Sequence, residues 1–330
     1  MRCDAVLSSR IRLARNYEDF PFDLAKNREL AEVCISRTEN ALRLSPDGED
    51  FTLLRLSDMS QEDRQAMSDM HLISQDLLRF PDSAAVLMKN DESAVIMMNE
   101  EDHLRIQSIA KGLDLLTPAS RCFGIEDTLS RQVSFAFDDQ LGYLTACPTN
   151  TGTGMRASVL MHLPMLTLGK QMGNVGQTVA KVGLNIRGVY GEGSEALGNI
   201  YQVSNQVTLG RTEEDLIAAV TAVANQLSDM EAAIREKTLL EKPAYTEDLV
   251  FRSWGILTNA RLMPLTEFYR NWSGVRLGAS RGLLEVDPER LDTLPEAVQN
   301  ACLRAKFGVE LDDDALLQKR AELIREALTD

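Results

Sequence analysis

The sequence lacks the long hydrophobic runs of a membrane protein. None of its apolar stretches reaches the roughly 18 residues needed to span a bilayer. The N-terminal segment MRCDAVLSSRIRLAR also lacks the apolar stretch of a secretory signal. Hydrophobic residues nevertheless make up 44% of the 330-residue chain, which is enough to fill a sizeable core. We therefore expect a globular protein that stays in the cytoplasm and has no membrane partner.

Positive charge is scarce relative to negative charge. Lysine and arginine total 35 against 50 aspartates and glutamates, which gives a formal net charge of −15. Non-specific affinity for nucleic acid comes from cationic contacts to phosphates. The balance therefore argues against a general nucleic-acid-binding protein, whereas it would attract basic partners.

Cysteine is sparse and shows no metal-binding spacing. The five cysteines, at positions 3, 34, 122, 147 and 302, form no CxxC pair and no histidine-paired pattern. The spacing disfavours both a disulfide framework and a zinc site. We expect reduced thiols and assign no metal ligand.

The common glycine-rich nucleotide loops are absent, yet the chain contains a candidate anion site. No GxxxxGK[ST] sequence occurs, and no GxGxxG follows a predicted strand. The segment CPTNTGTGMRAS instead combines the thiol of Cys147 with Gly152, Gly154 and Arg156. Glycines let backbone N–H groups approach a ligand closely, and an arginine offers a positive fork suited to phosphate or carboxylate.

Three further segments carry arginines or carboxylates that could bind charged groups of a ligand. SSRIRLAR places Arg10 and Arg12 two residues apart, so both face the same side of an extended strand and repel unless an anion lies between them. NEEDHLR, at 99–105, puts three carboxylates, a histidine and an arginine just past a predicted strand end. RGVYGEGSEALG, at 187–198, adds another arginine and a carboxylate on a glycine-rich loop.

Hydrophobic periodicity predicts strands mixed with helices, without a regular βαβ alternation. Helices are expected at 27–43, 61–80, 103–116, 122–137, 163–182 and 212–236, and strands from 51 and at 84–88, 93–98, 142–146, 184–189 and 199–209. Beyond residue 242 the pattern is almost wholly helical. We therefore expect an α+β fold in which helices flank an antiparallel sheet, with a domain boundary near residue 242.

The four motifs, in this order, resemble those of the phosphagen (guanidino) kinases, and most closely those of the bacterial protein-arginine kinases. The resemblance runs from about residue 5 to about residue 210 and continues more loosely to the C-terminus. It implies a phosphagen-kinase-like catalytic domain at 1–242 and a smaller all-helical domain at 243–330, which in the family supports a homodimer. Apolar helical faces alone cannot distinguish a dimer interface from a core.

The resemblance implies that one group of residues binds ATP. Phosphoryl transfer needs neutralisation of the phosphate charge more than covalent chemistry, and arginines with a magnesium ion meet that need. An isolated arginine is usually a solvated surface group, so this interpretation depends on the five arginines occurring together. His71 matches an adenine-contacting histidine only loosely, so a packed or surface histidine is an equally good interpretation. The assigned residues are Ser8, Arg10, Arg12, His71, Arg105, Arg156 and Arg187.

The resemblance also implies carboxylates for a guanidinium acceptor. Glu101 is the expected general base, because a cationic guanidinium must lose a proton as the N–P bond forms, and Glu192 is expected to orient the fork. Glu100 belongs to the same motif, although a solvated acidic turn capping a helix near residue 103 is the alternative. Cys147 matches the family's active-site thiol, with a small buried hydrophobe before a proline as the alternative.

Departures from the small-molecule kinases favour a protein substrate. Those enzymes carry a helical domain ahead of the SSRIR strand, whereas here the strand begins at residue 8, so we expect an open guanidinium pocket. By the same resemblance we expect a Clp-type protease that receives the marked proteins and a zinc-binding activator. Gln202 replaces a commonly acidic residue, and Leu316-Leu317 replaces an Arg-Asp pair used in phosphoarginine sensing, ahead of Arg320-Ala321.

Two other functions compete with protein-arginine phosphorylation. One is a small-molecule guanidino kinase that makes a phosphagen such as phosphoarginine. The other is a non-catalytic adaptor that binds arginine-rich or phosphorylated proteins, although a pure binder would not need the arginines assigned to the ATP phosphates.

Overall fold

A large antiparallel sheet forms the centre of the protein. The computed structural model describes residues 5–24, 26–45, 48–190, 196–308 and 311–329. Within these residues the sheet has eight strands in the order β2-β3-β4-β5-β1-β8-β10-β9, and all neighbours are antiparallel. The strands are β1 (Val6–Arg15), β2 (Phe51–Arg55), β3 (Ala85–Lys89), β4 (Ala94–Met98), β5 (Leu104–Lys111), β8 (Met155–His162), β9 (Leu184–Tyr190) and β10 (Ala196–Asn205); β6 (Phe137–Asp138) and β7 (Gly142–Tyr143) form a separate ribbon.

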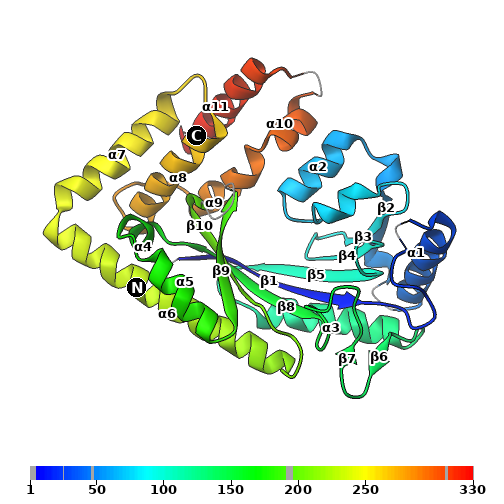
Figure 1. Ribbon diagram of the computed structural model, residues 1–330. Helices are drawn as coiled ribbons and strands as arrows, with labels where there is room; N and C mark the ends of the chain where they lie inside the picture. Colours follow the sequence, from blue (N-terminus) through cyan, green and yellow to red (C-terminus); the bar gives the residue numbers. More distant parts are fainter. Residues whose placement is uncertain (1–4, 25, 46–47, 191–195, 309–310, 330) are drawn as a thin grey trace.

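Helices cover both faces of the sheet and form the C-terminal part of the chain (Figure 1). The α-helices are α1 (Arg28–Arg43), α2 (Gln61–Asp69), α3 (Leu116–Ser130), α4 (Pro164–Leu168), α5 (Met172–Lys181), α6 (Glu213–Glu241), α7 (Pro243–Asn259), α8 (Leu265–Ser280), α9 (Pro288–Ala297), α10 (Asn300–Phe307) and α11 (Asp313–Thr329). Short 3₁₀ turns lie at Gly48–Asp50, Leu56–Asp58 and Asp76–Arg79. No described helix has the length and apolar composition that crossing a bilayer requires.

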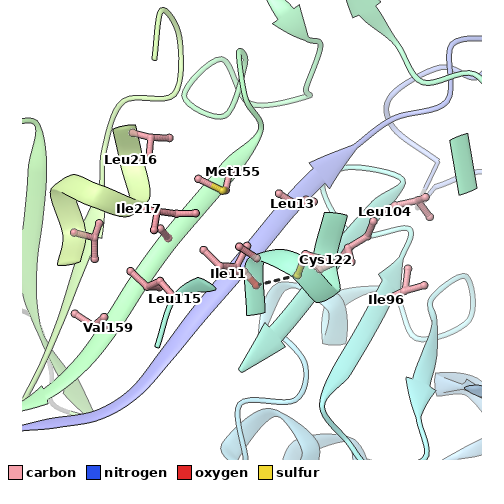
Figure 2. Packing of buried hydrophobic residues seen from close by; sticks show 14 of the residues in the cluster. Ile11, Leu13, Ile96, Leu104, Leu115, Cys122, Met155, Val159, Leu216 and Ile217 are labelled. Carbon is pink, nitrogen blue, oxygen red and sulfur yellow. Dashed lines mark hydrogen bonds between the residues drawn. The ribbon is translucent and has the colours of Figure 1, made fainter. Parts of the chain in front are cut away.

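Alternation along the strands gives the sheet one mainly apolar face. Ile11 and Leu13 of β1 point to this face, where they pack with Leu104 of β5 and Met155 of β8 (Figure 2). Helices α1, α3, α5 and α6 cover it, and Cys122 of α3 approaches the Ile11 carbonyl oxygen at 3.7 Å. Burial of these side chains is the main stabilising contribution in this half of the molecule.

The opposite face of the sheet is covered only at its two ends. At the β3–β4 end, Val86, Val95 and Met97 pack against the region of α2. At the β9–β10 end, Ile200 joins the core of the C-terminal helices, in which Trp272 is fully buried. A strip between these two clusters remains uncovered, and the polar side chains of β1, β5, β8, β9 and β10 lie there.

The C-terminal helices also reach the region of α2 on the other side of this strip. Helix α10 packs against α2, and Cys302 Sγ lies 3.9 Å from the carbonyl oxygen of Ala66. Figure 1 shows the two helices next to each other, although they are far apart in the sequence. The uncovered strip is therefore flanked by parts of the chain from both ends of the sequence.

The structure confirms the α+β class, the hairpin of β3 and β4, and the helix predicted from 212. The helix predicted at 103–116 is wrong, because this segment is strand β5, whose residues alternate between the apolar face and the uncovered strip. The helix predicted at 61–80 ends at Asp69. The helix predicted at 122–137 begins at Leu116 instead, because Pro118 is tolerated within a first turn.

The remaining differences concern element ends. The predicted helix at 163–182 is broken into α4 and α5 by Lys170, whose φ is 55°. The strand predicted at 142–146 is only the two-residue β7, and β10 ends at Asn205 rather than at 209. The predicted limits at 27–43 and 184–189 agree with α1 and β9 to within one residue.

A buried ion pair connects α6 to the start of α4. Glu231 is fully buried and accepts hydrogen bonds from the backbone N–H groups of Met165 (3.0 Å) and Leu166 (2.9 Å). It also pairs with Arg235 at 2.8 Å. Removing one member of such a pair leaves a buried charge without its counter-charge and two amides without an acceptor.

We therefore predict that Glu231→Ala lowers the free energy of unfolding by about 3–5 kcal/mol, measured by urea denaturation. Glu236→Ala is the matched control, because Glu236 lies on the same helix but is exposed, and we expect it to leave the unfolding curve unchanged. A loss for Glu231→Ala similar to that of the control would contradict this account of the ion pair.

Candidate active site

The uncovered strip of the sheet forms one wall of a deep cleft. The cleft has a volume of about 1370 Å³ and is lined by strand residues on one side and by residues 68–76 and 288–299 on others. It therefore lies between the sheet, the segment that follows α2, and α9. A cavity of this size can hold a nucleotide.

Five arginines line this cleft from four strands: Arg10, Arg12, Arg105, Arg156 and Arg187. In the β1–β8 pairing Arg12 lies directly opposite Arg156. Burial is the largest cause that lowers the pKa of Arg12 well below its ordinary value, and the positive charges of the neighbouring arginines are the next. The pKa of Arg156 is lowered by burial and by two neighbouring arginines. Like charges in this position are destabilising unless an anion lies between them.

Protein groups contact Arg105, Arg156 and Arg187, and two of these three arginines still have one buried donor unused. Arg105 pairs with Glu100, Arg156 donates to Ser204 Oγ at 3.0 Å, and Arg187 donates to Gln202 Oε1 at 3.0 and 3.2 Å. Among the described residues, Arg105 Nε and Arg156 Nε are buried without a hydrogen-bond acceptor. Buried donors without an acceptor are costly, so this set of residues fits a polyanion such as the phosphates of ATP.

The three carboxylates of the NEED motif have three different environments. Glu100 is buried and pairs with Arg105 and Ser74, so it faces away from solvent. Glu101 is exposed and lines the cleft. Asp102 is buried and accepts from Asn16 Nδ2 at 2.7 Å. The alternative of a solvated acidic turn capping a helix is therefore wrong, because the motif leads into strand β5.

Glu101 has the properties of a proton acceptor. Partial burial is the largest cause that raises its pKa, and the negative charges of Asp102 and Glu100 raise it further, against the opposing effect of Arg105. A raised pKa makes a carboxylate a stronger base for a proton from a bound cation. Its position at the cleft makes it the carboxylate of the motif that a substrate can reach.

Of the other two residues predicted for the acceptor side, the structure describes Cys147 but not Glu192. Cys147 is partly exposed and lines the cleft, with Sγ 3.0 Å from Thr149 Oγ1, which disagrees with the alternative of a buried hydrophobe. Glu192 lies outside the described residues.

His71 and Ser8 also line the cleft. Burial, and then the charge of Arg10, lower the pKa of His71 to about 4, so its imidazole is neutral near pH 7. Gln107 Nε2 donates to the His71 carbonyl oxygen at 2.8 Å and holds the backbone at this point. A neutral ring in this place fits contact with the adenine ring of ATP better than contact with a phosphate.

Two residues that help to build the site were missed by the sequence analysis. Ser74 contacts Glu100, and Gln107 holds His71. Gln107 lies two residues after Arg105 on the same strand, so strand alternation places it on the same face of the sheet as Arg105. No sequence signal indicates Ser74, because its partner is 26 residues away.

Arg320, near the C-terminus, is held by backbone carbonyl groups inside the helical core. It is almost fully buried, and it donates to the carbonyl oxygens of Val298 and Met263 at 2.8 Å each. Leu316, four residues earlier, is buried in the same core. These carbonyl contacts explain why a charged side chain is tolerated in this part of the core.

Comparison with known proteins agrees with this geometry. Residues 34–234 match the family model described as "ATP:guanido phosphotransferase, C-terminal catalytic domain". Residues 243–330 match the model described as "Protein-arginine kinase McsB C-terminal domain".

Within the described chain no cluster of three or more His, Cys, Asp or Glu side chains could hold a metal ion.

Curated relatives match along almost the whole chain. The protein-arginine kinase of Caldanaerobacter subterraneus subsp. tengcongensis is 42% identical over 97% of this chain and 96% of its own length. That of Symbiobacterium thermophilum is 44% identical over 99% and 94%. Among solved structures, the substrate-free duplicated taurocyamine kinase from Schistosoma mansoni is 29% identical with a TM-score of 0.63, covering 75% of this chain and 37% of that one. The chain therefore belongs to the ATP:guanido phosphotransferase family and, within it, to the protein-arginine kinases.

Proposed function

We propose that the protein transfers the γ-phosphoryl group of ATP to the guanidinium group of arginine side chains in proteins. The observation that carries the proposal is one cleft lined by five arginines of the sheet and by the carboxylate of Glu101. The arginines suit the phosphates of the donor, and the carboxylate suits a cationic acceptor. Curated relatives of nearly the same length bear the name protein-arginine kinase, which supports a protein as the acceptor.

On the donor side, the chain supplies charge neutralisation. The five arginines would hold the phosphate oxygens, with Ser8 on the same strand wall and His71 on the segment 68–76 at another side of the cleft. Magnesium, when bound with ATP, would supply further positive charge at those oxygens. The repulsion among the arginines would be relieved when the triphosphate binds, and the charge that spreads over the γ-phosphoryl oxygens during transfer would be stabilised.

On the acceptor side, Glu101 would take the proton. As the guanidinium nitrogen forms its bond to phosphorus, the bond from phosphorus to the β–γ bridging oxygen breaks and ADP leaves with that electron pair. The proton released by the guanidinium nitrogen passes to the Glu101 carboxylate. Glu192 would orient the guanidinium fork, and Cys147 would lie beside it, as the family resemblance implies.

Glu100 has an indirect role in this proposal. Its carboxylate pairs with Arg105 and is not exposed to the cleft, so it would hold Arg105 in place for the phosphates.

We also propose a catalytic domain at 1–242 and a helical domain at 243–330. Dimerisation through the helical domain, a zinc-binding activator, a Clp-type protease and a cytoplasmic location in protein quality control and the stress response are further proposals, drawn from the resemblance alone.

The first test is the product. The protein is incubated with Mg-ATP and a basic, partly unfolded protein, in parallel with free arginine, and phosphoramidate is detected by mass spectrometry under non-acidic conditions. We expect phosphoarginine on the protein and none on free arginine. Product on free arginine would instead indicate a small-molecule guanidino kinase. Absence of product together with binding of arginine-rich proteins would indicate an adaptor.

Glu101→Gln should reduce kcat by about 10²–10⁴-fold with ATP binding retained, because the base is removed but no phosphate contact is lost. The deprotonated form is the active one, so in the wild type kcat/KM should fall as pH drops through a pKa above the ordinary glutamate value. The variant should lack this acid limb. Glu236→Gln serves as the exposed control, and an acid limb that persists in Glu101→Gln would show that another group is the base.

Arg187→Ala should weaken transfer by about 2–4 kcal/mol, or roughly 30- to 900-fold in kcat/KM, because one donor to the developing phosphate charge is lost. The matched control is Arg131→Ala, an exposed arginine at the end of α3, which should behave like the wild type. Both are measured by steady-state kinetics with a protein substrate. Equal rates for the two variants would remove Arg187 from the site.

A further inference from the structure

Asn16 joins two segments that reach the cleft from different parts of the chain. It follows the last residue of β1 and is almost fully buried. Its Oδ1 accepts from the backbone N–H of His103 at 2.8 Å, and its Nδ2 donates to Asp102 Oδ1 at 2.7 Å and to the Leu144 carbonyl oxygen at 3.1 Å. One amide therefore holds residues 102–103 and residue 144 together.

Asp102 completes this connection. Its Oδ1 also accepts from the backbone N–H of Ala146 at 2.8 Å. Asp102 is adjacent to Glu101 in the sequence, and Ala146 is adjacent to Cys147. The carboxylate and the thiol of the proposed acceptor side are thus each one residue away from the same buried hydrogen-bond network.

The Cys147 segment has a second attachment that does not involve Asn16. Arg15 donates to the Thr153 carbonyl oxygen at 3.0 Å, and its guanidinium carbon lies 3.5 Å from the centre of the Tyr143 ring. Arg15 also forms a buried ion pair with Glu126 at 2.5 Å. Loss of Asn16 should therefore leave the segment attached to the sheet and to Asp102 through Ala146, but it removes the bonds that fix Asp102, His103 and Leu144 together, so the segment can shift relative to Glu101.

We propose that Asn16 is a positioning residue that sets the separation of Glu101 and Cys147 across the acceptor side of the cleft. Asn16 is not among the residues that line the cleft, so it acts through Asp102 and the backbone rather than on the substrate. The inference rests on the proposed function, because it takes Glu101 and Cys147 to flank the guanidinium that receives the phosphoryl group. Four arginines of the donor side, Arg10, Arg12, Arg156 and Arg187, lie outside the segments that Asn16 joins and should be unaffected.

The kinetic test compares Asn16→Ala with Asn271→Ala. Asn271 is also a buried asparagine, on α8; its Nδ2 donates to the Glu267 carbonyl oxygen at 2.8 Å, and it is not among the residues that line the cleft. A shift of about 1 Å in reacting groups can cost about 10²-fold in rate. We expect Asn16→Ala to lose about 10- to 100-fold in kcat with an almost unchanged KM for ATP, and Asn271→Ala to keep its kcat.

A second readout does not depend on activity. Alkylation of Cys147 by iodoacetamide is followed by peptide mass spectrometry in the protein without ATP, and its rate should change several-fold in Asn16→Ala but not in Asn271→Ala. If Asn16→Ala does not fold, Asp102→Ala removes the same link from the other side and is compared in its place.

The outcomes separate this inference from the proposed function. A kcat for Asn16→Ala no lower than that of Asn271→Ala, a rise in the KM for ATP that accounts for the loss, or an unchanged alkylation rate of Cys147 would each overturn the positioning role. A wild-type protein that makes no phosphoarginine would refute the proposed function, while the alkylation comparison would still test the link between Asn16 and the Cys147 segment.

Discussion

The strict alternation of side chains along β1 is the constraint on which the rest of the structure depends. Ile11 and Leu13 enter the apolar core, and Arg10 and Arg12, which alternate with them, face the cleft. A shift of one residue in the register would bury two guanidinium groups and expose the core residues, so the packing of the sheet fixes the position of the charges. Strand β1 lies between β5 and β8, and the same alternation therefore places the arginines of those strands.

The charge arrangement is unfavourable in the protein alone and favourable with its proposed ligand. Arg12 on β1 lies opposite Arg156 on the neighbouring strand β8. The buried Nε atoms of Arg105 and Arg156 have no acceptor among the described residues. Folding of the apolar face can offset this cost, because burial of large side chains contributes far more than the repulsion of a few screened charges removes. A site organised in this way does not have to rearrange when an anion enters, which is the basis of electrostatic catalysis.

The sequence predicts features that depend on local periodicity and misses those that depend on distant contacts. The hairpin at 84–98, the helix from 212 and the common face of Arg10 and Arg12 follow from spacing alone. Strand β5 was predicted as a helix, because its identity depends on the pairing with β1 and β4, which no local pattern reveals. The link from Asn16 to Asp102 joins residues 86 positions apart, and nothing in the local composition around Asn16 indicates it.

The packing of α10 against α2 has a consequence for biosynthesis. Residues 288–299 form part of the cleft wall, and α10 completes the contact with the region of α2 only after nearly all of the chain has been made. Contacts between segments so distant in sequence form late, because loop closure over a long chain costs entropy that local contacts do not pay. A nascent chain on the ribosome therefore contains all eight strands of the sheet before it contains the residues that complete the cleft wall.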